Sequence, residues 1–313
     1  MDNSVNQPTG AAGEGGFVFP GRPPEKFPWL NIILFALTCL STLIVGTFLM
    51  AGFRETLSTS PGSFFVEIWN SPSLLAGGAP FSFAIMSILL AHEMGHYLTC
   101  RYYGISATLP FFIPAPTIVG TMGAFIRIRA PIHNRAALLD VGIAGPIAGF
   151  ALAIPALFIA LAQSRFVALA PSDSFGFGEP IIFKAVAALM GKTPPPGMDL
   201  YLHPIGLAAW FGFFATAINL LPVGQLDGGH IAYALFRRFH NKISQGFVIC
   251  LIPLGVFYWQ GWLLWIAILL FMGFRHPITL DDALPLERRH IWLGWLALIM
   301  FVLCFTPMPF YII

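Results

Sequence analysis

The chain has 313 residues, of which 57% are apolar and 10% charged, and its formal net charge at pH 7 is +2. Soluble domains carry about 25% charged residues, so this composition indicates a polytopic membrane protein and argues against a soluble globular one. The basic residues are scattered and are not interleaved with stacking aromatic side chains, which argues against a nucleic-acid partner.

The first stretch, residues 1–27, is rich in Gly, Pro, Asn and Ala and has no apolar core. We expect a disordered tail here. It does not resemble a signal peptide, because a signal peptide needs a basic start followed directly by an apolar run. The remaining residues, 28–313, are then one membrane-embedded domain.

Long apolar stretches predict an all-α polytopic membrane protein with about six or seven transmembrane helices. Residues 247–274 form two short spans, because Tyr258–Trp262 suit an interfacial turn between them. The other spans are expected at residues 29–52, 81–103, 137–163, 204–221 and 291–305, the last with an extension to residue 313 left open.

Loop charges assign an orientation to these spans. Basic residues gather before the first span, after the second, after the fourth and before the last. The positive-inside rule places all these groups on the cytoplasmic side or its equivalent in an organelle, and seven spans make them mutually consistent. We therefore expect an integral multi-pass protein, in the cell membrane if it is bacterial, with the N terminus toward the cytoplasm.

The second span carries the sequence His92-Glu93-Met94-Gly95-His96. Residues four apart lie on one face of a helix, about 6 Å apart along its axis, so both imidazoles can bind one zinc ion. Glu93 lies beside them as a candidate general base. Because an ionisable residue at membrane depth costs several kcal/mol, this stretch is a candidate functional site.

Residues 109–129 follow the second span and contain three prolines and two glycines, which rule out a regular helix. Residues 125–129 alternate apolar and basic side chains, which is typical of a strand. We expect a small β-hairpin or re-entrant segment at the membrane surface near the His-Glu sequence. Two roles stay open: a structural plug, and an edge strand that binds an extended substrate segment by β-augmentation.

A catalytic zinc ion takes three protein ligands and keeps one position for water. Asp227 is the best third candidate, because it is the only carboxylate in an apolar stretch on the same side of the membrane as the two histidines. Glycines around it, among them Gly228, let the backbone approach the metal. Glu93 would take the proton of the attacking water, and Asn219 is placed to donate a hydrogen bond to the developing oxyanion.

Three further features of the sequence have structural explanations or remain open. Gly142, Gly145 and Gly149 in the third span favour close contact between helices. Asp140 is better explained as a helix-terminal residue than as a ligand. For His230, which follows Asp227 closely, support of the site and a purely structural role are equally consistent with the sequence.

The combination of His92-Glu-x-x-His96 with Asn219-x-x-Pro-x-x-x-Leu-Asp227-Gly-Gly in a later helix resembles the site-2 protease family of intramembrane zinc metalloproteases, of the M50 type. Residues 114–125 and Gly145-Pro-x-Ala-Gly149 are similar to the branch that includes the plastid EGY-type proteins, here without an inserted PDZ segment or a CBS pair. The resemblance implies that His92, His96 and Asp227 bind one Zn²⁺, that Glu93 is the base and that Asn219 assists catalysis.

By this resemblance, residues 28–313 are a membrane-embedded metalloprotease domain with its catalytic core at about residues 80–240. The expected activity is that of a zinc metalloendopeptidase that cleaves peptide bonds within or near transmembrane segments. Its expected partners are a membrane-protein substrate and the lipid bilayer. The oligomeric state is not predicted.

Three alternatives are weighed against the protease. A catalytically silent protein of the same fold would act as a binding or chaperone-like partner, but the intact set of His92, Glu93, His96 and Asp227 argues against a lost active site. A membrane di-iron hydroxylase needs several His boxes, and the sequence has one. A transporter would need more ionisable residues within its spans.

Overall fold

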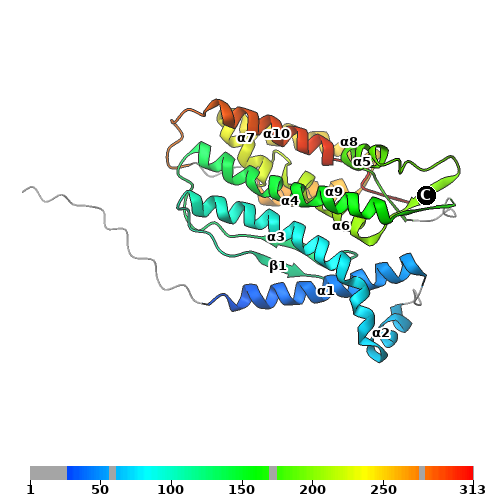
Figure 1. Ribbon diagram of the computed structural model, residues 1–313. Coiled ribbons are helices and arrows are strands. Elements are labelled where there is room, and N and C mark those ends of the chain that lie inside the picture. Colours follow the sequence, from blue (N-terminus) through cyan, green and yellow to red (C-terminus); the bar gives the residue numbers. More distant parts are fainter. Residues whose placement is uncertain (1–26, 56–60, 169–174, 275–278, 313) are drawn as a thin grey trace, which may run out of the picture.

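The computed structural model describes residues 27–55, 61–168, 175–274 and 279–312. The tail predicted for residues 1–27 lies outside these ranges except for its last residue. The chain is mostly helical, and the axes of the long helices are roughly parallel to one another (Figure 1). The helices are α1 (Trp29–Arg54), α2 (Pro61–Asn70), the 3₁₀ helix η1 (Pro72–Gly78), α3 (Ala79–Tyr102), α4 (Arg135–Gln163), α5 (Ile181–Leu189), α6 (Pro204–Asn219), α7 (Asp227–Phe236), the 3₁₀ helix η2 (Arg237–Phe239), α8 (His240–Phe257), α9 (Gly261–Met272) and α10 (Arg288–Cys304).

Three helical segments in the described part of the chain are long and apolar enough to cross a membrane: α1, α3 together with η1, and α4. They correspond to the first three expected spans. Helices α6 and α9 are apolar but shorter, at 16 and 12 residues. The expected interfacial turn is present, because α8 ends at Phe257 and α9 begins at Gly261.

The core around the second span is built from helices α3, α4 and α6. Their small residues, among them Ala153 and Ala217, are fully or almost fully buried and allow the helix backbones to approach. Larger side chains such as Leu157 and Phe213, both 0% exposed, fill the space between them. This packing holds the segment with the two histidines inside the protein.

Three small antiparallel sheets lie outside the helical core. Strand β1 (Phe111–Pro114) pairs with β2 (Thr121–Phe125), β3 (Arg165–Ala168) with β5 (Met198–Tyr201), and β4 (Phe175–Phe177) with β6 (Phe310–Ile312). The first pair confirms the predicted hairpin near the His-Glu sequence. The other two pairs were not predicted, because each joins short segments far apart in the sequence.

One expectation about local structure needs correction, and the structure decides one point that the sequence left open. The regular strand of the hairpin is at Thr121–Phe125, earlier than the alternating segment 125–129, where the structure has one isolated bridge between Ala107 and Ile128. The last helix ends at Cys304, since Pro307 and Pro309 cannot continue it, and residues 310–312 form a strand. The segment between the first and second expected spans also contains a helix, α2.

Candidate metal centre

Helix α3 presents the two histidines on one face. His92 and His96 are each 7% exposed, and their Nε2 atoms are 3.2 Å apart. Their spacing of four residues is close to one helical turn, which is why the rings lie next to each other. Two imidazole nitrogens this close in a buried site need a shared partner, a proton or a metal ion.

Asp227 completes the cluster from a different part of the chain. It is the first residue of α7, and its Oδ2 atom is 3.3 Å from Nε2 of His92 and 3.3 Å from Nε2 of His96. The next residue, Gly228, packs against the carbonyl oxygen of Leu220 so tightly that a Cβ atom there would overlap it. A glycine at this position therefore lets α7 begin beside the end of α6 and direct Asp227 at the histidines.

These three atoms, which we call the ligand triangle, have the dimensions of a zinc site. Tetrahedral zinc with bonds of about 2.0–2.1 Å separates neighbouring ligand atoms by about 3.3–3.4 Å, and the triangle has sides of 3.2, 3.3 and 3.3 Å. Nδ1 of His96 lies 2.7 Å from the carbonyl oxygen of Val141. Donation to this oxygen directs the lone pair of Nε2 toward the triangle. The residues present fit a zinc ion.

Glu93 and Asn219 border the same cleft, which has a volume of about 220 Å³. Glu93 is 7% exposed and lines this cleft from α3. Asn219 is the last residue of α6, and its Nδ2 atom is 3.2 Å from Nε2 of His92. The cleft therefore places a carboxylate and an amide beside the ligand triangle.

One wall of the cleft is the backbone segment that continues strand β2. On one side this segment pairs with Thr108, which precedes strand β1. The backbone N–H of Thr108 donates to the carbonyl oxygen of Arg127, and the N–H of Arg127 donates to Oγ1 of Thr108. Because backbone polar groups alternate sides along a strand, those of Ile126 and Ile128 point to the opposite side. Both residues line the cleft, and neither forms a backbone–backbone hydrogen bond with another described residue. A strand edge without a partner strand therefore faces the ligand triangle.

A larger cleft of about 400 Å³ adjoins the first. The two share five lining residues: Phe125, Ile126, Ile128, Gln225 and His230. Together they form a continuous groove along the strand edge. His230, whose role the sequence left open, lies on the wall common to both clefts.

Three glycines of α4 contact the histidines directly, a relationship that the sequence did not reveal. A Cβ atom at Gly145 would overlap the ring of His96, and one at Gly149 would lie 3.2 Å from Cβ of His92. At Gly142 the added atom would lie 3.1 Å from Cβ of His230. The spacing of these glycines predicted close contact between helices. The available signal for the contact with the histidines was that Gly145 and Gly149 are four residues apart, as are His92 and His96.

Asp140 does not join the ligand triangle. It lies in the second turn of α4, and its Oδ2 atom accepts a hydrogen bond of 2.6 Å from the hydroxyl of Tyr103. Arg289 and His290 of α10 approach the same carboxylate at 3.8 and 3.6 Å. Asp140 thus connects the end of α3 with α4 and the start of α10.

The sequence that carries the ligand triangle is similar to a known protein family and to named proteins. The sequence model described as Peptidase family M50 matches residues 80–258, which include every residue of the ligand triangle. The chain is 32% identical over 258 residues to "Probable zinc metalloprotease EGY2, chloroplastic" from Arabidopsis thaliana, covering 79% of this chain and 45% of that protein. It is 31% identical over 164 residues to the EGY1 protein of the same plant, covering 51% of this chain and 30% of the relative. The chain therefore spans less than half the length of these relatives.

Proposed function

Since the chain belongs to peptidase family M50, we propose that it is a zinc metalloendopeptidase that cleaves peptide bonds within or near transmembrane segments of other membrane proteins. The observation that carries this proposal is the ligand triangle with Glu93 beside it: His92, Glu93 and His96 are buried on the apolar helix α3, and Asp227 comes from α7. A buried set of two imidazoles and one carboxylate fits a catalytic zinc ion with three protein ligands.

His92, His96 and Asp227 would hold the ion. When bound, zinc supplies the Lewis acidity that makes water a nucleophile near neutral pH. The Glu93 carboxylate takes the proton of the attacking water and later delivers it to the leaving amine. The Asn219 amide donates a hydrogen bond to the oxygen that becomes negative as the carbonyl is attacked. The hydrogen bond between His96 and Val141 keeps that imidazole oriented toward the triangle.

We propose that an extended substrate segment binds along the free edge formed by Ile126 and Ile128. A transmembrane helix hides its peptide bonds in internal hydrogen bonds, so it must unfold locally before a carbonyl can be attacked. An unpaired strand edge supplies alternative partners for the exposed backbone groups. The groove beside this edge contains both Glu93 and the ligand triangle, so a bound strand would lie against the catalytic groups.

The proposed topology has seven crossings, formed by α1, α3, α4, α6, α8, α9 and α10, within one domain of residues 28–313 whose catalytic core covers about residues 80–240. The basic residues at the ends of these helices favour a cytoplasmic position for the N terminus and the metal centre. Cleavage there would release a fragment of the substrate on the same side.

The decisive experiment uses the substitution Glu93→Gln in protein reconstituted with a membrane-protein substrate. We expect cleavage to fall by at least about 100-fold, because the general base is lost, while one zinc ion per chain stays bound, because the three ligands remain. Zinc is measured by elemental analysis and cleavage by mass spectrometry of the fragments. Undiminished cleavage by this variant would refute the mechanism. A wild-type protein that binds zinc but cleaves none of the membrane proteins tested would favour the catalytically silent alternative.

A further inference from the structure

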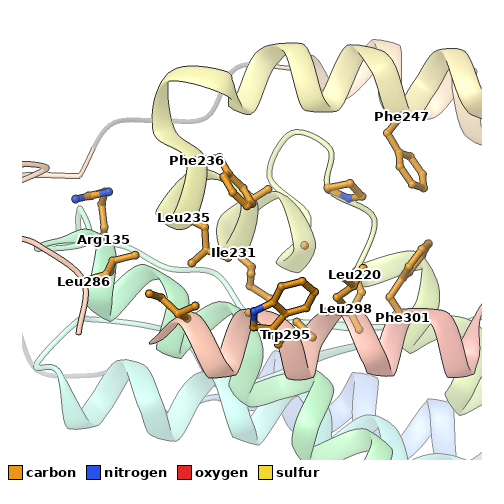
Figure 2. A pocket seen from close by; sticks show the side chains of 16 residues that line it. Arg135, Leu220, Ile231, Leu235, Phe236, Phe247, Leu286, Trp295, Leu298 and Phe301 are labelled. Atoms are coloured by element: carbon orange, nitrogen blue, oxygen red, sulfur yellow. The ribbon is translucent and has the colours of Figure 1, made fainter. Parts of the chain in front are cut away.

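We propose that a pocket between helices α7, α8 and α10 binds one anionic phospholipid, with an acyl chain in the pocket and the phosphate at Arg135. This α7–α10 pocket has a volume of about 750 Å³ and lies behind the metal centre. Sixteen side chains line it, and Figure 2 shows Arg135 at one end of the row, with Phe247 and Phe301 at the other. The proposal rests on the membrane embedding of the proposed function.

Helix α7 separates the pocket from the metal centre. The lining residues of this helix, Gly228, Ile231, Ala232 and Leu235, repeat at intervals of three and four and therefore form one face. Asp227 and His230 point to the other side, into the clefts beside the ligand triangle. A lipid in the pocket would thus contact the helix that positions the carboxylate ligand.

The size of the pocket favours a single acyl chain over a protein helix. Its wall on α10 extends from Ile291 to Phe301, a length of about 15 Å at 1.5 Å per residue. The hydrocarbon core of a bilayer is about 30 Å thick, so this wall covers about one leaflet, which suits one acyl chain and is about half the length of a transmembrane helix. An acyl chain is thinner and flexible, and it fits an elongated apolar volume.

The pocket is open toward the side of the molecule that would face lipid. Three of its lining residues are about half exposed: Phe236 at 52%, Trp295 at 55% and Leu298 at 48%. Large apolar side chains with this exposure are more favourable in contact with acyl chains than with water. A lipid can therefore enter sideways from the bilayer without passing through water.

The charged end of the pocket is suited to a phosphate. Arg135 donates to the carbonyl oxygens of Ala234 and Leu284, but its Nε atom is buried without a hydrogen-bond partner. In the described part of the chain, no carboxylate oxygen lies within ion-pair distance of Arg135. The Asp282 carboxylate contacts Arg237 and interacts with Arg135 only over a longer distance. An anionic headgroup oxygen would satisfy this donor and the positive charge together.

Two further arginines flank this end and are exposed. Arg238 lies two residues after the lining residue Phe236, and Arg288 begins α10 three residues before the lining residue Ile291. Neither has an ion-pair partner among the residues that the structure describes. Each basic residue near a membrane surface increases the attraction for anionic lipid, so the headgroup end is selective for net negative charge.

The test is native mass spectrometry of the delipidated protein titrated with dioleoyl phosphatidylglycerol or with dioleoyl phosphatidylcholine. We expect one phosphatidylglycerol to be retained, with an affinity about fivefold higher than that for phosphatidylcholine. Leu298→Trp should fill the pocket and abolish retention. Ile299→Trp is the matched control, since the neighbouring residue is 53% exposed but does not line the pocket, and it should retain the lipid.

The headgroup contact is tested separately. Arg135→Gln should remove the preference for phosphatidylglycerol, and Arg135→Lys should keep most of it, which guards against a simple loss of folding. Arg129→Gln, at an exposed arginine outside the pocket, should change nothing. Equal affinity for the two lipids in the wild type, or equal retention by Leu298→Trp and Ile299→Trp, would overturn the proposal.

The identity of the occupant is tested in membranes with a photoreactive benzoylphenylalanine at position 295, where it replaces a lining tryptophan of similar size and leaves the pocket open. We expect cross-links to phospholipid, identified by their added mass. A cross-link to a substrate peptide in place of lipid would show that the pocket receives protein and would refute the assignment. None of these measurements depends on peptide cleavage, so an inactive protease and an absent lipid site give distinguishable results.

Discussion

Gly145 of α4 lies in direct contact with the imidazole of His96 on α3, and the contact leaves no room for a Cβ atom. Gly95 precedes His96 on α3, and a Cβ atom there would lie 2.5 Å from the carbonyl oxygen of Ala144 on α4. Each helix thus has a glycine at the point where it contacts the other. This close packing places α4 where Val141 can accept the hydrogen bond from His96. A glycine on one helix thus determines the position of a metal-binding side chain on another.

The first prediction follows from this contact. Gly145→Ala should push the His96 ring away from the ligand triangle and lower the bound zinc well below one ion per chain, measured by elemental analysis of purified protein. Gly246→Ala is the control, because nothing lies within 4 Å of a Cβ atom there and alanine favours a helix over glycine by about 1 kcal/mol. Full zinc occupancy in the Gly145 variant would contradict the assigned role of the contact.

The second prediction concerns the third ligand. Asp227→Asn keeps the shape of the side chain but removes the negative charge that faces the two imidazoles. We expect zinc affinity to fall by at least about tenfold, measured by competition with a chelator. Asp140→Asn, on the same side of the molecule, should keep wild-type affinity because Asp140 bonds to Tyr103 and lies outside the triangle. Equal affinities in the two variants would exclude Asp227 as a ligand.

The third prediction concerns Asn219. Asn219→Ala should lower kcat by about 100-fold or more and leave zinc content unchanged, because a hydrogen bond to the developing oxyanion is lost while the ligands remain. Gln225→Ala, on another wall of the same cleft, should have a much smaller effect on kcat. A change confined to KM in the Asn219 variant would indicate substrate binding as its role.

The fourth prediction addresses the pH dependence of stability outside the membrane. Burial opposes ionisation of Asp282, but hydrogen bonds from Thr279 and Tyr233 and the nearby Arg237 outweigh it and hold the pKa of this carboxyl below its usual value. A lowered pKa in the folded state means that this stabilisation is present above about pH 4 and is lost as the pH falls further. Melting temperatures between pH 5 and pH 3 should therefore fall less steeply in Asp282→Asn than in the wild type.

The matched control for this prediction is the adjacent carboxylate. Asp281 is exposed, and its Oδ1 atom accepts a hydrogen bond from the backbone N–H of Ala283. Asp281→Asn should keep the slope of the wild type. If both variants flatten the curve equally, the effect belongs to the net charge of the loop and not to the Asp282 contacts.

Local features of the sequence predicted what depends on local spacing. The interval of four residues put His92 and His96 on one helical face, and the apolar stretches located the helices α1, α3, α4 and α6 within a few residues. The prolines between residues 109 and 129 predicted the hairpin, although its regular strand begins at Thr121 and not at Phe125. The alternation of residues 125–129 indicates extended backbone, but only pairing with another segment decides where a regular ladder forms.

The contacts that complete the site depend on segments far apart in the chain, and the tertiary structure alone decided them. The sequence favoured Asp227 as the third ligand because it is expected on the same side of the membrane as the two histidines. Its distance of 3.3 Å to both imidazoles, however, results from the packing of α7 against the end of α6 at Gly228. The contact of Gly145 with His96 joins residues on two helices whose rotation about their axes is not encoded in either segment alone. By itself, the sequence determined which residues are candidates for the chemistry, because residue type and helical spacing are local properties. The positions of those residues relative to one another were decided by the fold, because close packing of helices and loops fixes distances between distant segments.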